Sequence, residues 1–146
     1  MRAIPGDAKG RPRPATRDIV PTESEEQQAL FRWAQLQSGR YPELKLLYHI
    51  PNEGFRSPAT GARLRAEGLR RGVPDICLPA ARGGYHGLYI ELKRTKGGVA
   101  SAEQLDWLVA LHEAGYAATI CRGWDDARRR ILEYLDLDGE DDGHGT

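Results

Sequence analysis

The chain has 146 residues, 40% of them hydrophobic, and its 21 Lys and Arg balance 21 Asp and Glu at zero formal net charge. This length and composition fit one modest domain, and no run approaches the roughly 18 apolar residues that a membrane span needs. Zero net charge gives the chain no overall electrostatic attraction to nucleic acid, so a surface that binds nucleic acid must be a local patch of positive charge. The N-terminus lacks the apolar stretch of a signal peptide, and we expect a cytoplasmic protein.

The first half of the chain is predicted to hold two helices and a strand. Residues 1–21 are rich in Pro, Gly and Arg and are predicted to be a disordered basic tail. A helix is expected to begin near Thr22 and to end at Ser38, because acids and then apolar residues at helical spacing follow Thr22. The apolar run Leu44–Ile50 predicts a strand, and a short basic helix is expected over residues 59–68.

The second half alternates strands and helices. Strands are expected over Val73–Pro79, Leu88–Lys93 and Tyr116–Cys121. A capping-box pattern at Ser101 opens a helix that ends at Gly115, and Asp125 is expected to cap a last helix that ends near Leu135. The order α, β, α, β, β, α, β, α predicts an α/β fold with a mixed sheet flanked by helices. The domain is expected to span residues 22–136, and residues 137–146 are expected to form an acidic flexible tail.

The two middle strands bring polar residues together if they form a hairpin centred near Gly83. Asp75 and Glu91 then lie opposite each other, about 5 Å apart, and Lys93 points to the same face. The opposite face receives only apolar side chains, Ile76, Leu78, Leu88, Ile90 and Leu92. Two close carboxylates repel each other unless a cation or a proton lies between them.

Oxygen ligands of this kind favour Mg²⁺ or Mn²⁺. Such a metal binds phosphate and activates water, and a nearby lysine offsets developing negative charge. Asp75, Glu91 and Lys93 therefore outline a site for phosphodiester hydrolysis. The alternative is a solvated salt-bridge ladder, which acid and lysine residues on a strand also form by chance. No Cys and His pattern at zinc spacing accompanies the acids, and Cys77 and Cys121 are interpreted as core thiols.

Three short motifs resemble the VRR-NUC branch of the PD-(D/E)xK nucleases. They are GLRRGVPD at Gly68–Asp75, GLYIELK at Gly87–Lys93 and SAEQ at Ser101–Gln104. The resemblance covers roughly residues 22–135 and is strongest to the short stand-alone proteins of phages and prophages. It implies a restriction-endonuclease-like core with a mixed four-stranded sheet, DNA cleavage with Mg²⁺ or Mn²⁺, and kinship with Holliday-junction resolvases.

The same resemblance implies roles for single residues. Asp75 and Glu91 would be metal ligands, Leu92 would lend its backbone carbonyl, and Lys93 would be the catalytic lysine. The family also uses a glutamate on the first helix, for which Glu23, Glu25 and Glu26 compete. Glu23 is preferred because Gln27, four residues on, matches the family's spacing; Glu26, on the apolar stripe, is the alternative. Each of them could instead only stabilise the helix dipole.

The remaining polar residues allow two interpretations each. Gln104 reaches the metal site or a phosphate, or it only completes the capping box with Ser101. Gln27 and Asn52 are candidates to support the site, and Asn52 could equally form a simple turn. Basic residues expected to contact DNA, unless they form a solvated face, are Arg63, Arg65, Arg70, Arg71 and Lys96. The histidines His49, His86 and His112 are interpreted as structural or exposed.

The expected function is a metal-dependent DNA endonuclease that selects branched, junction or flap DNA. A neutral chain of this size offers little DNA surface, so a homodimer with two sites is expected, in line with the family. One alternative is a non-catalytic DNA-binding accessory protein of recombination or packaging with the same fold. Another is a nuclease that acts on RNA.

Overall fold

The structure, a computed structural model, describes residues 19–51 and 57–138. Its centre is a four-stranded sheet in the order β1-β2-β3-β4. The strands are β1 (Tyr48–His49), β2 (Ile76–Leu78), β3 (Leu88–Lys93) and β4 (Ala117–Arg122). The first three pair antiparallel, and β4 runs parallel to β3. The predicted α/β class with a mixed four-stranded sheet is confirmed.

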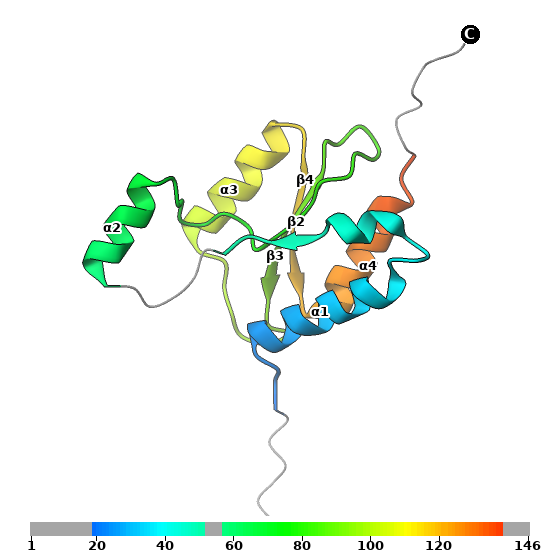
Figure 1. Ribbon diagram of the computed structural model, residues 1–146, viewed down its shortest axis with the longest axis horizontal. Coiled ribbons are helices and arrows are strands. Elements are labelled where there is room, and N and C mark those ends of the chain that lie inside the picture. Colours follow the sequence, from blue (N-terminus) through cyan, green and yellow to red (C-terminus); the bar gives the residue numbers. More distant parts are fainter. Residues whose placement is uncertain (1–18, 52–56, 139–146) are drawn as a thin grey trace, which may run out of the picture.

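Helices lie on both faces of this sheet (Figure 1). They are α1 (Glu23–Gln37), the 3₁₀ helix η1 (Pro42–Leu46), α2 (Pro58–Ala66), α3 (Ala102–Glu113) and α4 (Trp124–Leu135). In Figure 1, α1 and α4 pack together on one side of the sheet, α3 lies on the other side, and α2 projects from the body. No helix among the described residues is long and apolar enough to cross a membrane.

The hydrophobic core lies between the sheet and the α1–α4 pair. The strand residues predicted for the apolar face are all fully buried, namely Ile76, Leu78, Leu88, Ile90 and Leu92. Leu30 of α1 and Ile131 of α4 pack in the same cluster, each 0% exposed. Both cysteines are buried free thiols. Alternation of apolar and polar residues along β3 therefore sets which face of the sheet joins the core.

The predicted hairpin register is confirmed. Ile76 pairs with Ile90 and Leu78 with Leu88, as a turn centred near Gly83 requires. The second strand is shorter than the predicted Val73–Pro79, because Pro74 has no N–H for a sheet ladder and regular pairing begins only at Ile76. Asp75 therefore lies directly before β2, at the position that extends the ladder towards Glu91.

Two local predictions are wrong. Leu44–Ile50 is not one strand, since η1 occupies its first part and only Tyr48–His49 pairs with β2. The buried residues there are Leu44 and Leu47, three apart, which is the spacing of a 3₁₀ helix and not of a strand. The last helix is capped at Gly123 and not at Asp125.

The other helix starts agree with the sequence. Thr22 caps α1 by accepting a hydrogen bond from the Glu25 amide, and Ser101 forms a complete capping box with Gln104. Leu105 and Val109 of α3 are 47% and 59% exposed, so one flank of this helix is an apolar surface. The predicted tail residues 1–18 and 139–146, and Asn52, lie outside the described residues.

Candidate active site

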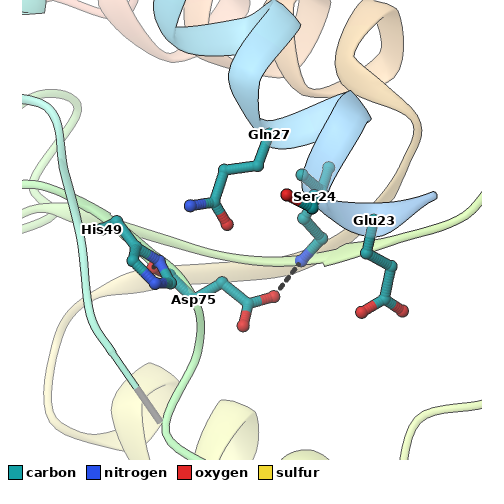
Figure 2. A pocket seen from close by; sticks show the side chains of 6 residues that line it. Glu23, Ser24, Gln27, His49 and Asp75 are labelled. Atoms are coloured by element: carbon teal, nitrogen blue, oxygen red, sulfur yellow. Dashed lines mark hydrogen bonds between the residues drawn. The ribbon is translucent and has the colours of Figure 1, made fainter. Parts of the chain in front are cut away.

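Asp75 is held at both its backbone and its side chain. Its carbonyl accepts hydrogen bonds from the Ile50 amide at 2.7 Å and from His49 Nδ1 at 2.8 Å. Its carboxylate Oδ2 accepts from the Leu92 amide at 2.9 Å, the bond drawn in Figure 2. These bonds join β1 and β3 to the segment before β2, so the carboxylate has a defined place beside β3.

Glu91 is the most deeply buried acid of the site, at 2% exposure. Its Oε1 accepts a hydrogen bond from Gln104 Nε2 at 2.8 Å and lies 3.3 Å from Lys93 Nζ. Its Oε2 is buried and meets no hydrogen-bond partner among the described residues. Burial, followed by the nearby charge of Asp75, raises the pKa of Glu91 to about 8.

Lys93 lies between the acids of two elements. Its side chain is 8% exposed, and its Nζ is 3.3 Å from Glu91 Oε1 and 4.0 Å from Glu23 Oε1. Glu91 is its neighbour two residues back on β3, whereas Glu23 opens α1. The lysine charge therefore partly compensates two carboxylates, one buried and one 41% exposed.

Two cavities flank Asp75. One, of about 210 Å³, is lined by Glu23, Ser24, Gln27, His49, Asp75 and Leu92. In Figure 2, Glu23, Ser24 and Gln27 project from α1, with Gln27 extending into the space above Asp75 and His49 lying beside Asp75. The other cavity, of about 230 Å³, is lined by Arg71, Gly72, Val73, Asp75, Ser101, Glu103 and Gln104. Asp75 is the residue that both cavities share.

Gly72, which lines the second cavity, allows α3 to pack closely against the chain before Asp75. A Cβ at this position would lie 2.7 Å from the Glu103 backbone, and its φ of +86° favours glycine. The start of α3 therefore approaches the chain just before Asp75. Gln104, at the start of α3, makes two side-chain hydrogen bonds. Its Oε1 accepts from the Ser101 amide, and its Nε2 donates to Glu91. Gln104 therefore completes the predicted capping box and also contacts Glu91.

The site's donors suit a hard divalent cation. Among the described residues, no three His, Cys, Asp or Glu side chains are grouped closely enough to hold a metal by themselves. The buried, unpaired Oε2 of Glu91 and the neighbouring Asp75 carboxylate nevertheless provide oxygens that a cation would satisfy. Backbone carbonyls and waters commonly complete such a coordination shell.

The three glutamates of α1 are placed differently. Glu23 lines the first cavity and faces Lys93. Glu26 is 5% exposed, and its Oε2 accepts a hydrogen bond from the Trp124 amide at 2.7 Å, so it caps the start of α4. Glu25 contacts the capping residue Thr22. Glu23 is thus the α1 acid that the fold brings to Asp75 and Lys93.

The basic residues expected to contact DNA fall into separate groups. Arg63 and Arg65 are exposed on α2, a helix with no buried residue. Arg70 donates to the carbonyls of Arg65 and Leu69 and so closes the end of α2, while Arg71 lines the second cavity. Lys96 is exposed in the loop after β3.

Two contributors to the site did not follow from the sequence patterns. His49, interpreted as structural or exposed, lines the first cavity and binds the Asp75 backbone. Arg94 donates to the carbonyls of Val20 and Pro21, which ties the entry of α1, and hence Glu23, to the end of β3. His49 stands two residues before Pro51 in the sequence, but only the pairing of β1 with β2 shows what it faces.

Comparisons with known proteins agree with this geometry. A sequence model of the VRR-NUC domain matches residues 21–125. A solved structure described as a VRR_NUC domain protein is 30% identical, with a TM-score of 0.71, and the match covers 82% of this chain and 92% of that one. No protein with a curated description matches the chain.

Proposed function

This chain belongs to the VRR-NUC family, and from that premise we propose that it is a metal-dependent endonuclease that cleaves branched, junction or flap DNA. The family and the fold are those of nucleases. The observation that supports the finer proposal best is the buried Glu91 beside Asp75 and Lys93, with one carboxylate oxygen unpaired. An acid buried in this way costs stability, which a bound cation would offset.

The proposed mechanism assigns each residue one task. Asp75, Glu91 and the carbonyl of Leu92 would hold Mg²⁺ or Mn²⁺. Glu23 would join them by moving towards the bound ion, because no three acids of the described residues are already grouped. The bound metal supplies Lewis acidity towards a phosphate oxygen and a lower pKa of bound water. Lys93 orients the attacking water and offsets negative charge that develops on the phosphate.

Gln104 and Gln27 support this site without entering the reaction. Gln104 keeps Glu91 in place through its 2.8 Å hydrogen bond. Gln27 lines the first cavity beside Asp75 and can meet a metal-bound water there. Both are amides, so they donate or accept hydrogen bonds without adding charge next to the acids.

DNA would approach along the side on which α2 projects. Arg63 and Arg65 are exposed there, and Arg71 lines the cavity next to Asp75. Phosphate contacts from such residues would give affinity without sequence reading. Lys96, exposed in the loop after β3, is also proposed to touch the DNA backbone.

The deciding experiment compares the wild-type chain with Asp75→Ala in Mg²⁺ or Mn²⁺. Linear, nicked, flapped and four-way DNA, and an RNA duplex, are offered at matched salt, because affinity for nucleic acid depends steeply on salt. We expect cleavage of branched or flapped DNA by the wild type and its loss in Asp75→Ala. Cleavage that survives Asp75→Ala would place the reaction elsewhere. Binding without cleavage by the wild type would support the accessory-protein alternative.

A homodimer is proposed as the working assembly. The exposed apolar flank of α3 at Leu105 and Val109 supports it, because a monomer gains nothing from leaving such residues in water. Light scattering of the wild type and of a Leu105→Glu, Val109→Glu double variant tests it. The wild type is expected at twice the monomer mass, and the variant at the monomer mass.

A further inference from the structure

His49 is joined to Asp75 by a hydrogen bond that fixes the tautomer of its ring. Nδ1 lies 2.8 Å from the Asp75 carbonyl oxygen. A carbonyl oxygen only accepts, so Nδ1 must carry the proton and donate it. In the neutral ring, Nε2 is then a hydrogen-bond acceptor.

The position of the ring makes that acceptor relevant to the proposed metal site. His49 lines the 210 Å³ cavity together with Glu23 and Asp75, and Figure 2 shows it beside the Asp75 side chain. Since Nδ1 is used by the Asp75 backbone, Nε2 is the ring nitrogen that can meet a group bound in the cavity. The acids of this cavity attract cations, and hydrated cations present water hydrogens as donors.

We propose that His49 is a positioning residue of the metal site: Nδ1 fixes the Asp75 backbone, and Nε2 accepts a hydrogen bond from a metal-bound water. The inference rests on the proposed function only in assuming that a divalent cation binds here. Mg²⁺ and Mn²⁺ prefer oxygen ligands and keep several waters, so Nε2 faces a water of the shell and not the ion.

This role differs from ordinary structural support. Ile50 already donates to the same Asp75 carbonyl at 2.7 Å, so the backbone there has a second donor. An imidazole at this place adds what a backbone amide cannot, an acceptor on the far side of its ring. Groups that hold a metal's ligands and waters in place commonly affect metal affinity 10–100-fold.

The test distinguishes the roles of the two ring nitrogens by removing Nε2 alone or both nitrogens together. In His49→Asn, the side-chain amide can replace Nδ1 as donor to Asp75, but nothing replaces Nε2. We expect its unfolding midpoint in urea without metal to match the wild type, and its Mn²⁺ affinity by calorimetry to fall about 10- to 100-fold. His49→Ala, which loses both nitrogens, is expected to lose stability as well. His112→Asn, an exposed histidine on α3, is the matched control and should bind Mn²⁺ as the wild type does.

A second measurement uses the unaltered chain, in case the variants fold poorly. Nitrogen-15 spectra of the histidine rings should show the His49 proton on Nδ1 without metal, and diamagnetic Mg²⁺ should shift its Nε2 resonance. Mn²⁺ affinity of His49→Asn within twofold of the wild type, or an Nε2 resonance that ignores Mg²⁺, overturns the proposal. A wild type that binds Mn²⁺ but cuts no DNA overturns the nuclease function alone; one that binds no divalent cation overturns both.

Discussion

The two faces of β3 are both buried, but they contribute opposite terms to stability. Leu88, Ile90 and Leu92 face α1 and α4 and are each 1% exposed. One residue out of step, Glu91 and Lys93 are 2% and 7% exposed on the α3 side. Burial of the leucine and isoleucine side chains drives folding, whereas burial of an ionisable carboxyl group and of a lysine opposes it. In β3, the stability gained from the apolar face therefore offsets the free-energy cost of burying polar side chains on the other face.

The largest expected effect comes from weakening the apolar face. Ile90→Ala should lower the free energy of unfolding by about 2–5 kcal/mol, because it opens a cavity in the core without touching a charge. Urea denaturation without metal measures this loss. A loss below about 1 kcal/mol would contradict the proposed difference between the two faces. The loss of unfolding free energy in Tyr89→Ala, at a half-buried residue on the other face of β3, is the comparison.

The affinity of the polar face of β3 for a divalent cation should depend on pH. The pKa of Glu91 is raised to about 8, chiefly by burial, so below that pH a cation must displace a proton to use both acids. Mn²⁺ affinity is therefore expected to rise about tenfold per pH unit from pH 6 to pH 8 and then to level off. Calorimetry in buffers of different ionisation enthalpy should show about one proton released. A flat affinity over this range would mean that Glu91 is not a ligand.

A third prediction compares the two acids of α1. Glu26→Ala should cost about 1–3 kcal/mol of unfolding free energy, since it leaves the Trp124 amide without its buried acceptor. Glu23→Ala should change stability little, because Glu23 is 41% exposed and 4.0 Å from Lys93, but it should weaken Mn²⁺ binding. Thermal unfolding and calorimetry on both variants measure the two effects. If Glu26→Ala weakened Mn²⁺ binding more than Glu23→Ala did, the assignment of the helix glutamate would be reversed.

These residues also show how far a sequence can be interpreted by itself. The hairpin register and the triad of Asp75, Glu91 and Lys93 were predictable because alternation along β3 admits one register that buries every apolar side chain. The 3₁₀ helix at Leu44 was missed, since an apolar run alone does not distinguish a spacing of two from one of three.

Partners far apart along the chain were beyond prediction. Glu26 caps α4 across 98 positions, and a local pattern cannot show that its carboxylate is already in use. His49 looked like an ordinary strand residue, because its partner, the Asp75 carbonyl, becomes visible only when β1 is laid against β2. Sequence therefore predicts which residues of neighbouring strands lie together better than it predicts the long-range contacts that hold them.

The pH dependence of stability tests the comparison of the two faces most directly. With the pKa of Glu91 at about 8 in the folded chain and near its ordinary value of 4.5 when unfolded, the folded state holds more protons between these limits. Without metal, the contribution of Glu91 to the free energy of unfolding should therefore be greatest below pH 4.5 and should fall as the pH rises towards 8. Glu91→Gln, which cannot ionise, should remove that fall while leaving the apolar face intact.

Melting temperatures of the metal-free wild type and Glu91→Gln, measured from pH 5 to pH 8, give the comparison. The wild type is expected to lose more stability over this range, so that the variant overtakes it near pH 8. Saturating Mg²⁺ should restore the wild type and not the variant, because a cation satisfies the carboxylate that burial penalises. Parallel curves for the two proteins would show that the polar face carries no such penalty, and the cost of burying Glu91 would then already be met by Lys93 and Gln104.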